Sequence, residues 1–276
     1  MWQSKTCLGR CGLEVQVGAA KVNKYASQES GDTLEVIERP HGGLSAVLVD
    51  GQRSGRAAKI ISNIVARKAI SLLGEGVRDG AVARAAHDYL RTHRRGQVSA
   101  ELQIVSVDLD SHSLVISRNS QCPVFVVSKG QLQSLDAPSQ PIGIYAYTKP
   151  VITELPLNAE TYVVVFTDGL RSAGERAGLS LDADKFQSTT TTIKGEIETC
   201  LVARLVQQGA QEHMSAQALA EDILDRALEA DEHRPADDIS VLVVAVLPNE
   251  IPDGVRHFSM SFPVEAEAVT KGGAFA

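Results

Sequence analysis

Three of the most apolar segments of this chain begin or end at an aspartate. These segments and their acids are 44–49 with Asp50, 162–167 with Asp168, and 239–244 with Asp237 and Asp238. Short runs rich in β-branched residues are typical of buried strands, so their ends lie at the edge of a rigid sheet, where side chains converge. Two carboxylates ~4 Å apart repel by ~4 kcal/mol at an effective dielectric of ~20, so several of them cluster only around protons or cations. The pattern therefore predicts a metal site.

A turn is the simpler explanation of any single Asp-Gly pair, because Asp bonds its own backbone and Gly accepts a positive φ. Asp79–Gly80 and Asp253–Gly254 follow no apolar strand, and we interpret both as turns. A fourth acid favours the metal site elsewhere. Asp32 precedes the alternating run 33–38, which leads through a Pro- and Gly-containing hairpin segment to the run that ends at Asp50. This hairpin can bring the two acids together.

Composition limits the class of protein. The chain has 276 residues, of which 43% are hydrophobic and 22% charged, and this balance indicates one large globular domain. The formal net charge of -7 argues against a nucleic-acid-binding protein. We find no apolar stretch long enough to span a membrane and no signal-peptide core after Met1, so we expect a cytoplasmic protein with no membrane partner.

The four cysteines give little information. Cys7 and Cys11 are spaced like half of a zinc site, whereas Cys122 and Cys200 have no partner pair. We expect reduced thiols, the latter two half-buried. None of the seven histidines falls in a motif, so we expect surface or hairpin positions for them and assign no general acid.

The predicted elements arrive in blocks. We expect strands at 13–18, 33–38, 44–49, 101–109, 113–117, 124–128, 161–167 and 239–244, and helices at 54–74, 82–90, 196–208 and 216–229. Because strands and helices do not alternate strictly, the pattern favours an α+β fold with antiparallel sheets covered by helices. Residues 1–12 form an irregular start in this prediction. Residues 248–276 form an extension with one possible strand at 255–264 and a frayed end.

The segment 50–56 joins a strand to a helix, which suggests a phosphate-binding loop. It matches neither known glycine-rich phosphate motif, and a carboxylate at its entrance would repel a bare phosphate. A cation between Asp50 and the phosphate removes this conflict. Gly51 could then bring its own carbonyl close to the metal, since carbonyl oxygens suit hard cations.

Four motifs occur in a fixed order: Ser30-Gly31-Asp32, Asp50-Gly51-x-x-Ser54-Gly55, Phe166-Thr167-Asp168-Gly169-Leu170 and Asp237-Asp238-x-Ser240-Val241. This set resembles the metal-dependent protein phosphatases (PPM, type 2C), and in particular the bacterial SpoIIE-like branch. Two weaker landmarks of that branch are present at 118–123 and 140–143. The resemblance covers residues 13 to 247.

The resemblance implies an αββα sandwich with a centre of two or more Mn²⁺ or Mg²⁺ ions at one end of its sheets. Asp50 would bridge two ions, with Asp168 and Asp237 on the first ion and Asp32 and the Gly51 carbonyl on the second. Asp50 and Asp168 would be the catalytic residues. Asp238 would be a neighbour of the ligands rather than a ligand.

The activity implied is hydrolysis of phosphoserine or phosphothreonine by a metal-activated water. The implied substrate is a bacterial regulator protein, such as a STAS-type anti-sigma-factor antagonist. Two alternatives stay open: a two-metal hydrolase of a small phosphoester and a catalytically silent pseudophosphatase scaffold, although the intact acids argue against the scaffold. The chain departs from the family at Arg53, where a small residue is usual; a solvated loop position is favoured there over a phosphate contact.

Overall fold

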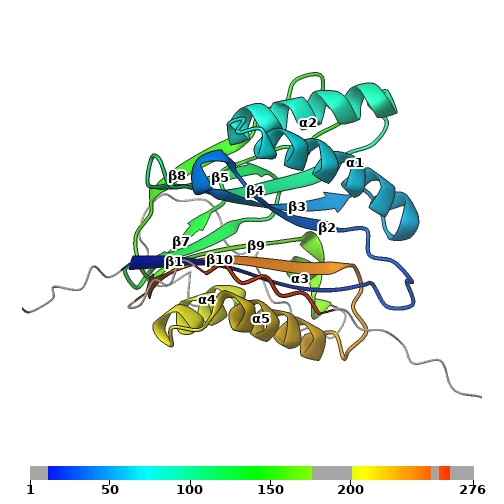
Figure 1. The fold of residues 1–276 in the computed structure, drawn as a ribbon. Coiled ribbons are helices and arrows are strands. Elements are labelled where there is room, and N and C mark those ends of the chain that lie inside the picture. Colours follow the sequence, from blue (N-terminus) through cyan, green and yellow to red (C-terminus); the bar gives the residue numbers. More distant parts are fainter. Residues whose placement is uncertain (1–11, 176–200, 250–254, 262–276) are drawn as a thin grey trace, which may run out of the picture.

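Two antiparallel sheets form the centre of the structure, a computed structural model that describes residues 12–175, 201–249 and 255–261 (Figure 1). Within these residues each sheet has five strands. The strand order in the first, sheet A, is β1 (Gly12–Val22), β10 (Ile239–Asn249), β9 (Thr161–Phe166), β6 (Val124–Ser128) and β7 (Gln131–Leu135). The order in the second, sheet B, is β2 (Thr33–Glu38), β3 (Leu44–Gly51), β4 (Ala100–Asp108), β5 (Ser113–Asn119) and β8 (Val151–Pro156).

Helices cover the outer face of each sheet. Figure 1 shows α1 (Gly55–Gly74) and α2 (Asp79–Arg94) over sheet B, and α4 (Leu201–Gln211) and α5 (Ala216–Ala230) under sheet A. The short α3 (Asp168–Ser172) follows β9, and a 3₁₀ turn, Pro40–Gly42, lies in the hairpin between β2 and β3. The predicted α+β fold, an αββα sandwich, is confirmed.

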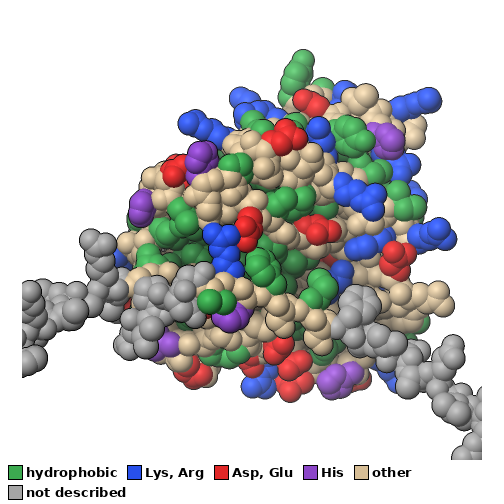
Figure 2. Space-filling view, viewed as in Figure 1, with side chains coloured by type: hydrophobic (Ala, Val, Ile, Leu, Met, Phe, Trp, Pro, Cys, Tyr) green, Lys and Arg blue, Asp and Glu red, His purple; other side chains and the backbone are tan. Residues whose placement is uncertain are grey.

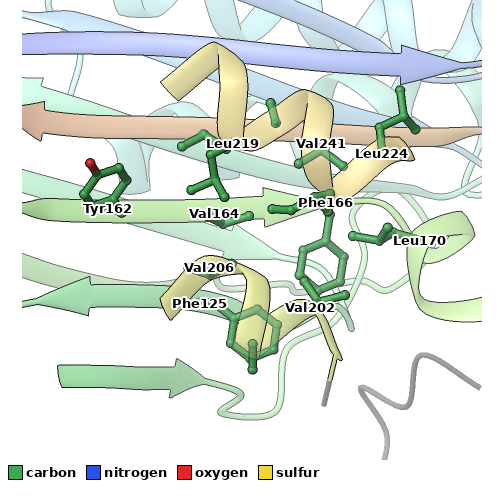
Figure 3. Packing of buried hydrophobic residues seen from close by; sticks show 14 of the residues in the cluster. Phe125, Tyr162, Val164, Phe166, Leu170, Val202, Val206, Leu219, Leu224 and Val241 are labelled. Carbon is green, nitrogen blue, oxygen red and sulfur yellow. The ribbon is translucent and has the colours of Figure 1, made fainter. Parts of the chain in front are cut away.

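Alternation along the strands fills three apolar layers. In β9, Val163 and Val165 lie between the two sheets, whereas Tyr162, Val164 and Phe166 pack toward α4 and α5 (Figure 3). A third layer fills the space between sheet B and α1 and α2. Because both faces of these strands are buried, their sequences are continuous apolar runs rather than alternating ones.

The predicted hairpins and helices are largely confirmed. Strands β2 and β6 have the predicted bounds, and the predicted cap of the last helix, Ser215, accepts a hydrogen bond from the Ala218 amide at 3.2 Å. Strand β1 extends beyond the predicted segment at both ends. Several predicted features lie outside the described residues: the start of the helix at 196–200, the cysteines Cys7, Cys11 and Cys200, and the turn at Asp253–Gly254.

Three expectations were incomplete or wrong. The sequence patterns missed β7 and β8, which are the outermost strands at one side of each sheet and have partly exposed, weakly apolar sequences. The predicted strand at 255–264 is wrong over 255–261, where the chain is exposed and has no regular structure; the remainder lies outside the described residues. Cys122 is fully buried rather than half-buried, and burial raises the pKa of its thiol.

The predicted turn at Asp79–Gly80 is wrong, because Asp79 belongs to a helix. It is the first residue of α2 and is buried, and its Oδ2 accepts a hydrogen bond of 2.9 Å from Nη1 of Arg39. Ser106 donates a second hydrogen bond to Oδ1. An acid is favourable in the first turn of a helix, where the free N–H groups carry partial positive charge. The ion pair ties the β2–β3 hairpin to α2.

Charge is divided between the two helical layers. Residues 52–97, which include α1 and α2, contain ten Lys and Arg against three Asp and Glu, although the whole chain is acidic. Figure 2 shows Lys and Arg gathered on the side of α1 and α2. Residues 201–230, which include α4 and α5, contain two Lys and Arg against five Asp and Glu. The loop that leads from Asp50 into α1 therefore enters the basic layer.

Candidate metal centre

Strand register brings acids to one end of the space between the sheets. In β3, Ala46 and Leu48 face the opposite sheet, and Asp50 continues their side of the strand because side chains alternate. Glu101 is the partner of Asp50 in the antiparallel β3–β4 ladder, so its side chain lies on the same face. Sheet B therefore presents two neighbouring carboxyl groups at this end.

Asp168 reaches the same place from sheet A. It follows β9 at the start of α3, part of its side chain is exposed, and its carboxylate accepts a hydrogen bond from the side chain of Asp50. Burial, followed by the charges of Asp32, Asp168, Glu101 and Asp237, raises the pKa of Asp50 to about 10. Burial and the charge of Asp237 raise the pKa of Asp168. The side chains of Asp50 and Asp168 thus meet at this end of the space between the two sheets.

Asp32 is the most deeply buried of the predicted ligands, with 1% of its surface exposed. Its Oδ2 accepts hydrogen bonds from Oγ1 of Thr167, at 3.0 Å, and from Oγ of Ser240, at 2.6 Å. Burial raises the pKa of Asp32 to about 7, and these two hydrogen bonds oppose the increase. Thr167, after β9, and Ser240, in β10, therefore hold Asp32, the residue that precedes β2 of sheet B.

The backbone carbonyl of Asp32, like its side chain, is held by hydrogen bonds. Its carbonyl oxygen accepts hydrogen bonds from Nζ of Lys59, at 2.6 Å, and from Nζ of Lys21, at 3.1 Å. Ser62 donates to the carbonyl of Gly31 at 2.5 Å. Helix α1 and strand β1 thereby fix the peptide groups around the acid.

The adjacent acids Asp237 and Asp238 have different surroundings. Asp238 is buried and continues the inner face of β10, whereas Asp237 is half-buried and lies before the strand begins. Both carboxylate oxygens of Asp238 accept backbone hydrogen bonds, from Lys24 at 2.9 Å and from Gly31 at 2.8 Å. The charge of Asp237 instead acts on Asp50 and Asp168. Strand alternation alone would have selected Asp238 as the inward-facing acid.

The glycines that follow the acids are required by close packing. A Cβ at Gly51 would lie 2.1 Å from the carbonyl oxygen of Ala58 in α1, and a Cβ at Gly169 would lie 2.1 Å from the carbonyl oxygen of Asp238. Neither glycine has a positive φ. Asp50–Gly51 and Asp168–Gly169 are thus positions of close backbone contact rather than turns.

Glu101 is an acid of this cluster that sequence patterns missed. Burial raises its pKa, hydrogen bonds from Ser120 and Gln121 lower it, and the charge of Asp168 raises it further. It occupies no motif, and only its register opposite Asp50 indicates its position. That register can be predicted from sequence only after both hairpins have been aligned.

The two weaker landmarks lie beside the same end of sheet B. Asn119 donates a hydrogen bond of 3.0 Å to the carbonyl of Gln140, and Ile142 forms a backbone bridge with Ala100, next to Glu101. The Gly143 amide donates a 3.0 Å hydrogen bond to Nδ1 of His87. His87 is buried, so our expectation that all histidines lie at the surface or in the hairpin was wrong for this one.

The donor set has the chemistry of a site for a hard cation. Carboxylate and carbonyl oxygens are the ligands that Mg²⁺ and Mn²⁺ prefer, and repulsion among the acids would be relieved by a divalent ion. Within the described residues, no group of three or more His, Cys, Asp or Glu side chains is arranged as it stands to hold a metal ion. Two surface hollows, one between α1 and α2 and one beside 26–29, contain none of these acids.

Solved structures share this architecture. The phosphatase domain of SpoIIE from Bacillus subtilis, solved with a fragment of its regulatory domain, has a TM-score of 0.69 and 18% identity, with 86% of this chain covered. The RsbU and RsbW domains of a Mycobacterium tuberculosis protein give a TM-score of 0.61, 16% identity and 87% coverage. The catalytic domain of the phosphatase PstP, in complex with two manganese ions, gives 0.59, 14% and 86%. These likenesses define the fold as that of the PP2C-type phosphatases.

The chain spans 64% of the length of the SpoIIE structure and 61% of that of the M. tuberculosis structure, but 100% of that of PstP. A comparison with curated proteins gave no match. Residues 40–247 match the family model of Stage II sporulation protein E. The chain therefore belongs to the SpoIIE family, and its fold is that of the PP2C-type phosphatases. The outer limits of the domain, 13–247, remain a prediction.

Among the described residues, no helix combines the length and the apolar character needed to cross a bilayer.

Proposed function

We propose that this chain hydrolyses phosphoserine or phosphothreonine on a protein, using two or more Mn²⁺ or Mg²⁺ ions. The proposed ligands are Asp32, Asp50, the Gly51 carbonyl, Asp168 and Asp237. The observation that carries this proposal is the convergence of acids from both sheets: Asp50 at the end of β3, Asp168 directly after β9, and Asp32, which Thr167 and Ser240 hold by hydrogen bonds. Carboxylates that converge in a buried place repel one another, and a divalent cation bound among them would relieve that repulsion. The manganese ions bound to PstP, which has a similar fold, support this assignment.

Bound there, the cations would lower the pKa of a water molecule and neutralise charge on the phosphoryl oxygens. The chain's own residues prepare the site for this chemistry. Thr167 and Ser240 orient the carboxylate of Asp32 by occupying one of its oxygens. The charges of Asp32, Asp168, Glu101 and Asp237 all act on Asp50. We infer that Asp50 and Asp168 are the catalytic residues.

Basic side chains stand at the entrance to this end of the sandwich. Arg53 and Arg56 are exposed in the segment that leads from Asp50 into α1. Guanidinium groups match the geometry of phosphate oxygens, so these residues favour a phosphorylated substrate. They also begin the basic layer of α1 and α2, which gives a protein substrate a surface to contact outside the centre.

For the substrate we propose a phosphorylated regulator protein, of the kind typified by STAS-type anti-sigma-factor antagonists. The similar M. tuberculosis structure, which contains RsbU and RsbW domains in one chain, supports a regulatory setting. A protein substrate would obtain part of its specificity from surface contacts away from the phosphate. Such remote contacts increase kcat/KM when they are used in the transition state.

Steady-state kinetics test this proposal. Activity on an aryl phosphate should require Mn²⁺ or Mg²⁺ and should vanish after metal stripping in excess chelator. A phosphorylated regulator domain should be hydrolysed with a kcat/KM at least ~100-fold above that of free phosphoserine, or ~2.7 kcal/mol of transition-state binding. A small metabolite that exceeds every phosphoprotein by that margin would establish the small-phosphoester alternative. Binding of a phosphoprotein without turnover in Mn²⁺ would establish the scaffold.

A further inference from the structure

We propose that Glu101 is a fifth carboxylate of the metal centre, and that its negative charge strengthens the binding of cations there. This inference rests on the proposed function. It adds a residue that lies in none of the four acidic motifs and that acts beside Asp50 rather than in place of it.

The direction of the Glu101 side chain follows from its strand. Val105 and Val107 of β4 pack between the two sheets, so Gln103 and Glu101 lie on the same inner face. Gln103 confirms this direction, because its Nε2 donates a hydrogen bond of 2.8 Å to the carbonyl of Phe166 in the opposite sheet. Glu101 is one step nearer to the end of the strand at which Asp50 and Asp168 meet.

Two hydrogen bonds hold the Glu101 carboxylate in place. Oε2 accepts from Oγ of Ser120 at 2.6 Å, and Oε1 accepts from the backbone amide of Gln121 at 3.0 Å. Both donors belong to the segment that carries the chain from β5 in sheet B to β6 in sheet A. Hydrogen bonds of this kind stabilise the charged form of a carboxylate. The Glu101 carboxylate is thus held in a fixed orientation where the chain passes from one sheet to the other.

The position of Glu101 allows two roles, which make different predictions. As a structural residue, it would only hold the crossover segment, and a glutamine could retain both hydrogen bonds if the Ser120 hydroxyl accepted from its amide. As a charge beside Asp50, it would attract cations, and the glutamine would lose that attraction. Glutamine has nearly the same shape as glutamate, so Glu101→Gln separates charge from packing.

The experiment is a calorimetric titration of the metal-stripped protein with Mn²⁺. Glu101→Gln should weaken Mn²⁺ binding by about 10-fold or more, because a negative charge next to the cations is lost. Glu101→Asp, which keeps the charge, should stay within about 3-fold of the wild type. Glu35→Gln is the matched control: the same change is made at an exposed acid of β2 in the same sheet, and binding should not change.

Wild-type affinity in Glu101→Gln would overturn the inference, and so would equal losses in Glu101→Gln and Glu101→Asp, since shape rather than charge would then matter. If circular dichroism shows that Glu101→Gln does not fold, Glu101→Thr replaces it, because a β-branched residue suits a strand and also lacks the charge. Failure of both to fold would assign Glu101 a structural role alone. If the wild-type protein binds no Mn²⁺, the proposed function itself fails.

Discussion

The amide of Gly31 donates a hydrogen bond of 2.8 Å to Oδ2 of Asp238. Since Oδ1 of Asp238 accepts from the Lys24 amide at 2.9 Å, both oxygens of this acid are used by the loop that carries Asp32. Its neighbour Asp237 is half-buried and accepts a hydrogen bond from the Asp238 amide. We therefore expect these two adjacent acids to have different roles: Asp238 stabilises the fold, and Asp237 binds metal.

Replacing Asp238 with alanine should lower the free energy of unfolding by about 1–3 kcal/mol, because two backbone N–H groups lose their acceptors. Asp237→Ala should change it by less than ~0.5 kcal/mol, as is usual for substitutions outside buried networks, and should instead abolish phosphatase activity. Urea denaturation in the presence of chelator measures the first effect and aryl phosphate hydrolysis the second. Equal stability losses in the two variants would contradict this division.

Asp50→Asn should reduce the phosphatase rate by at least ~100-fold, in line with the loss of preorganised charge stabilisation. The same loss is expected for Asp168→Asn and Asp237→Asn. In chelator, Asp50→Asn should nevertheless be at least as stable as the wild type at pH 8, because asparagine removes a carboxyl group whose charge the folded state disfavours. Thermal unfolding with and without Mn²⁺ gives this comparison. A fully active Asp50→Asn enzyme would end the assignment of Asp50 to the metal centre.

The stability of the metal-free protein should fall as the pH rises. The pKa values of Asp32 and Asp50 are raised to about 7 and about 10, so the folded state binds more protons than the unfolded state above pH ~4. Each proton retained only by the folded state lowers stability by up to ~1.4 kcal/mol per pH unit. The loss from Asp32 should extend to about pH 7 and that from Asp50 to about pH 10. Urea denaturation in chelator between pH 6 and 9 should show the decline, and saturating Mn²⁺ should reduce it. A stability that is independent of pH in chelator would argue against the clustered acids.

Arg53 has a φ of 78°, in the left-handed region that favours glycine. Arg53→Gly should therefore stabilise the fold by up to ~1 kcal/mol, since a residue with a Cβ is strained there and glycine is not. Arg67→Gly, at an exposed position in the middle of α1, should do the reverse by ~0.5–1 kcal/mol, because glycine is unfavourable within a helix. Thermal unfolding in chelator compares them. If Arg53 also contacts the substrate phosphate, Arg53→Gly will raise KM while it raises Tm.

Local patterns were sufficient to predict the acids at the ends of long apolar strands. Asp50 and Asp168 were found this way because runs buried on both faces stand out in the sequence. Glu101 was not found, because its role depends on which residue of the neighbouring strand lies opposite. Asp79 was misassigned for a similar reason: its partner Arg39 lies 40 residues away, and no local pattern joins the two. The edge strands β7 and β8 were missed because a strand with one solvent-exposed face has fewer apolar residues, and its sequence pattern is therefore weaker.

The pairing of β1 with β10 along 11 residues also determines when this protein can fold. Strands β2 to β5 form two hairpins that α1 and α2 connect, so these four strands of sheet B can pair early during synthesis, whereas sheet A is completed only by β10. Until then β1 and β9 lack the strand that pairs with both of them, and a nascent chain with unpaired strand edges is open to aggregation. A message cut short before the codon of Asp237 would yield a chain that contains Asp32, Asp50 and Asp168 but lacks Asp237 and β10, and no phosphatase activity should remain in it.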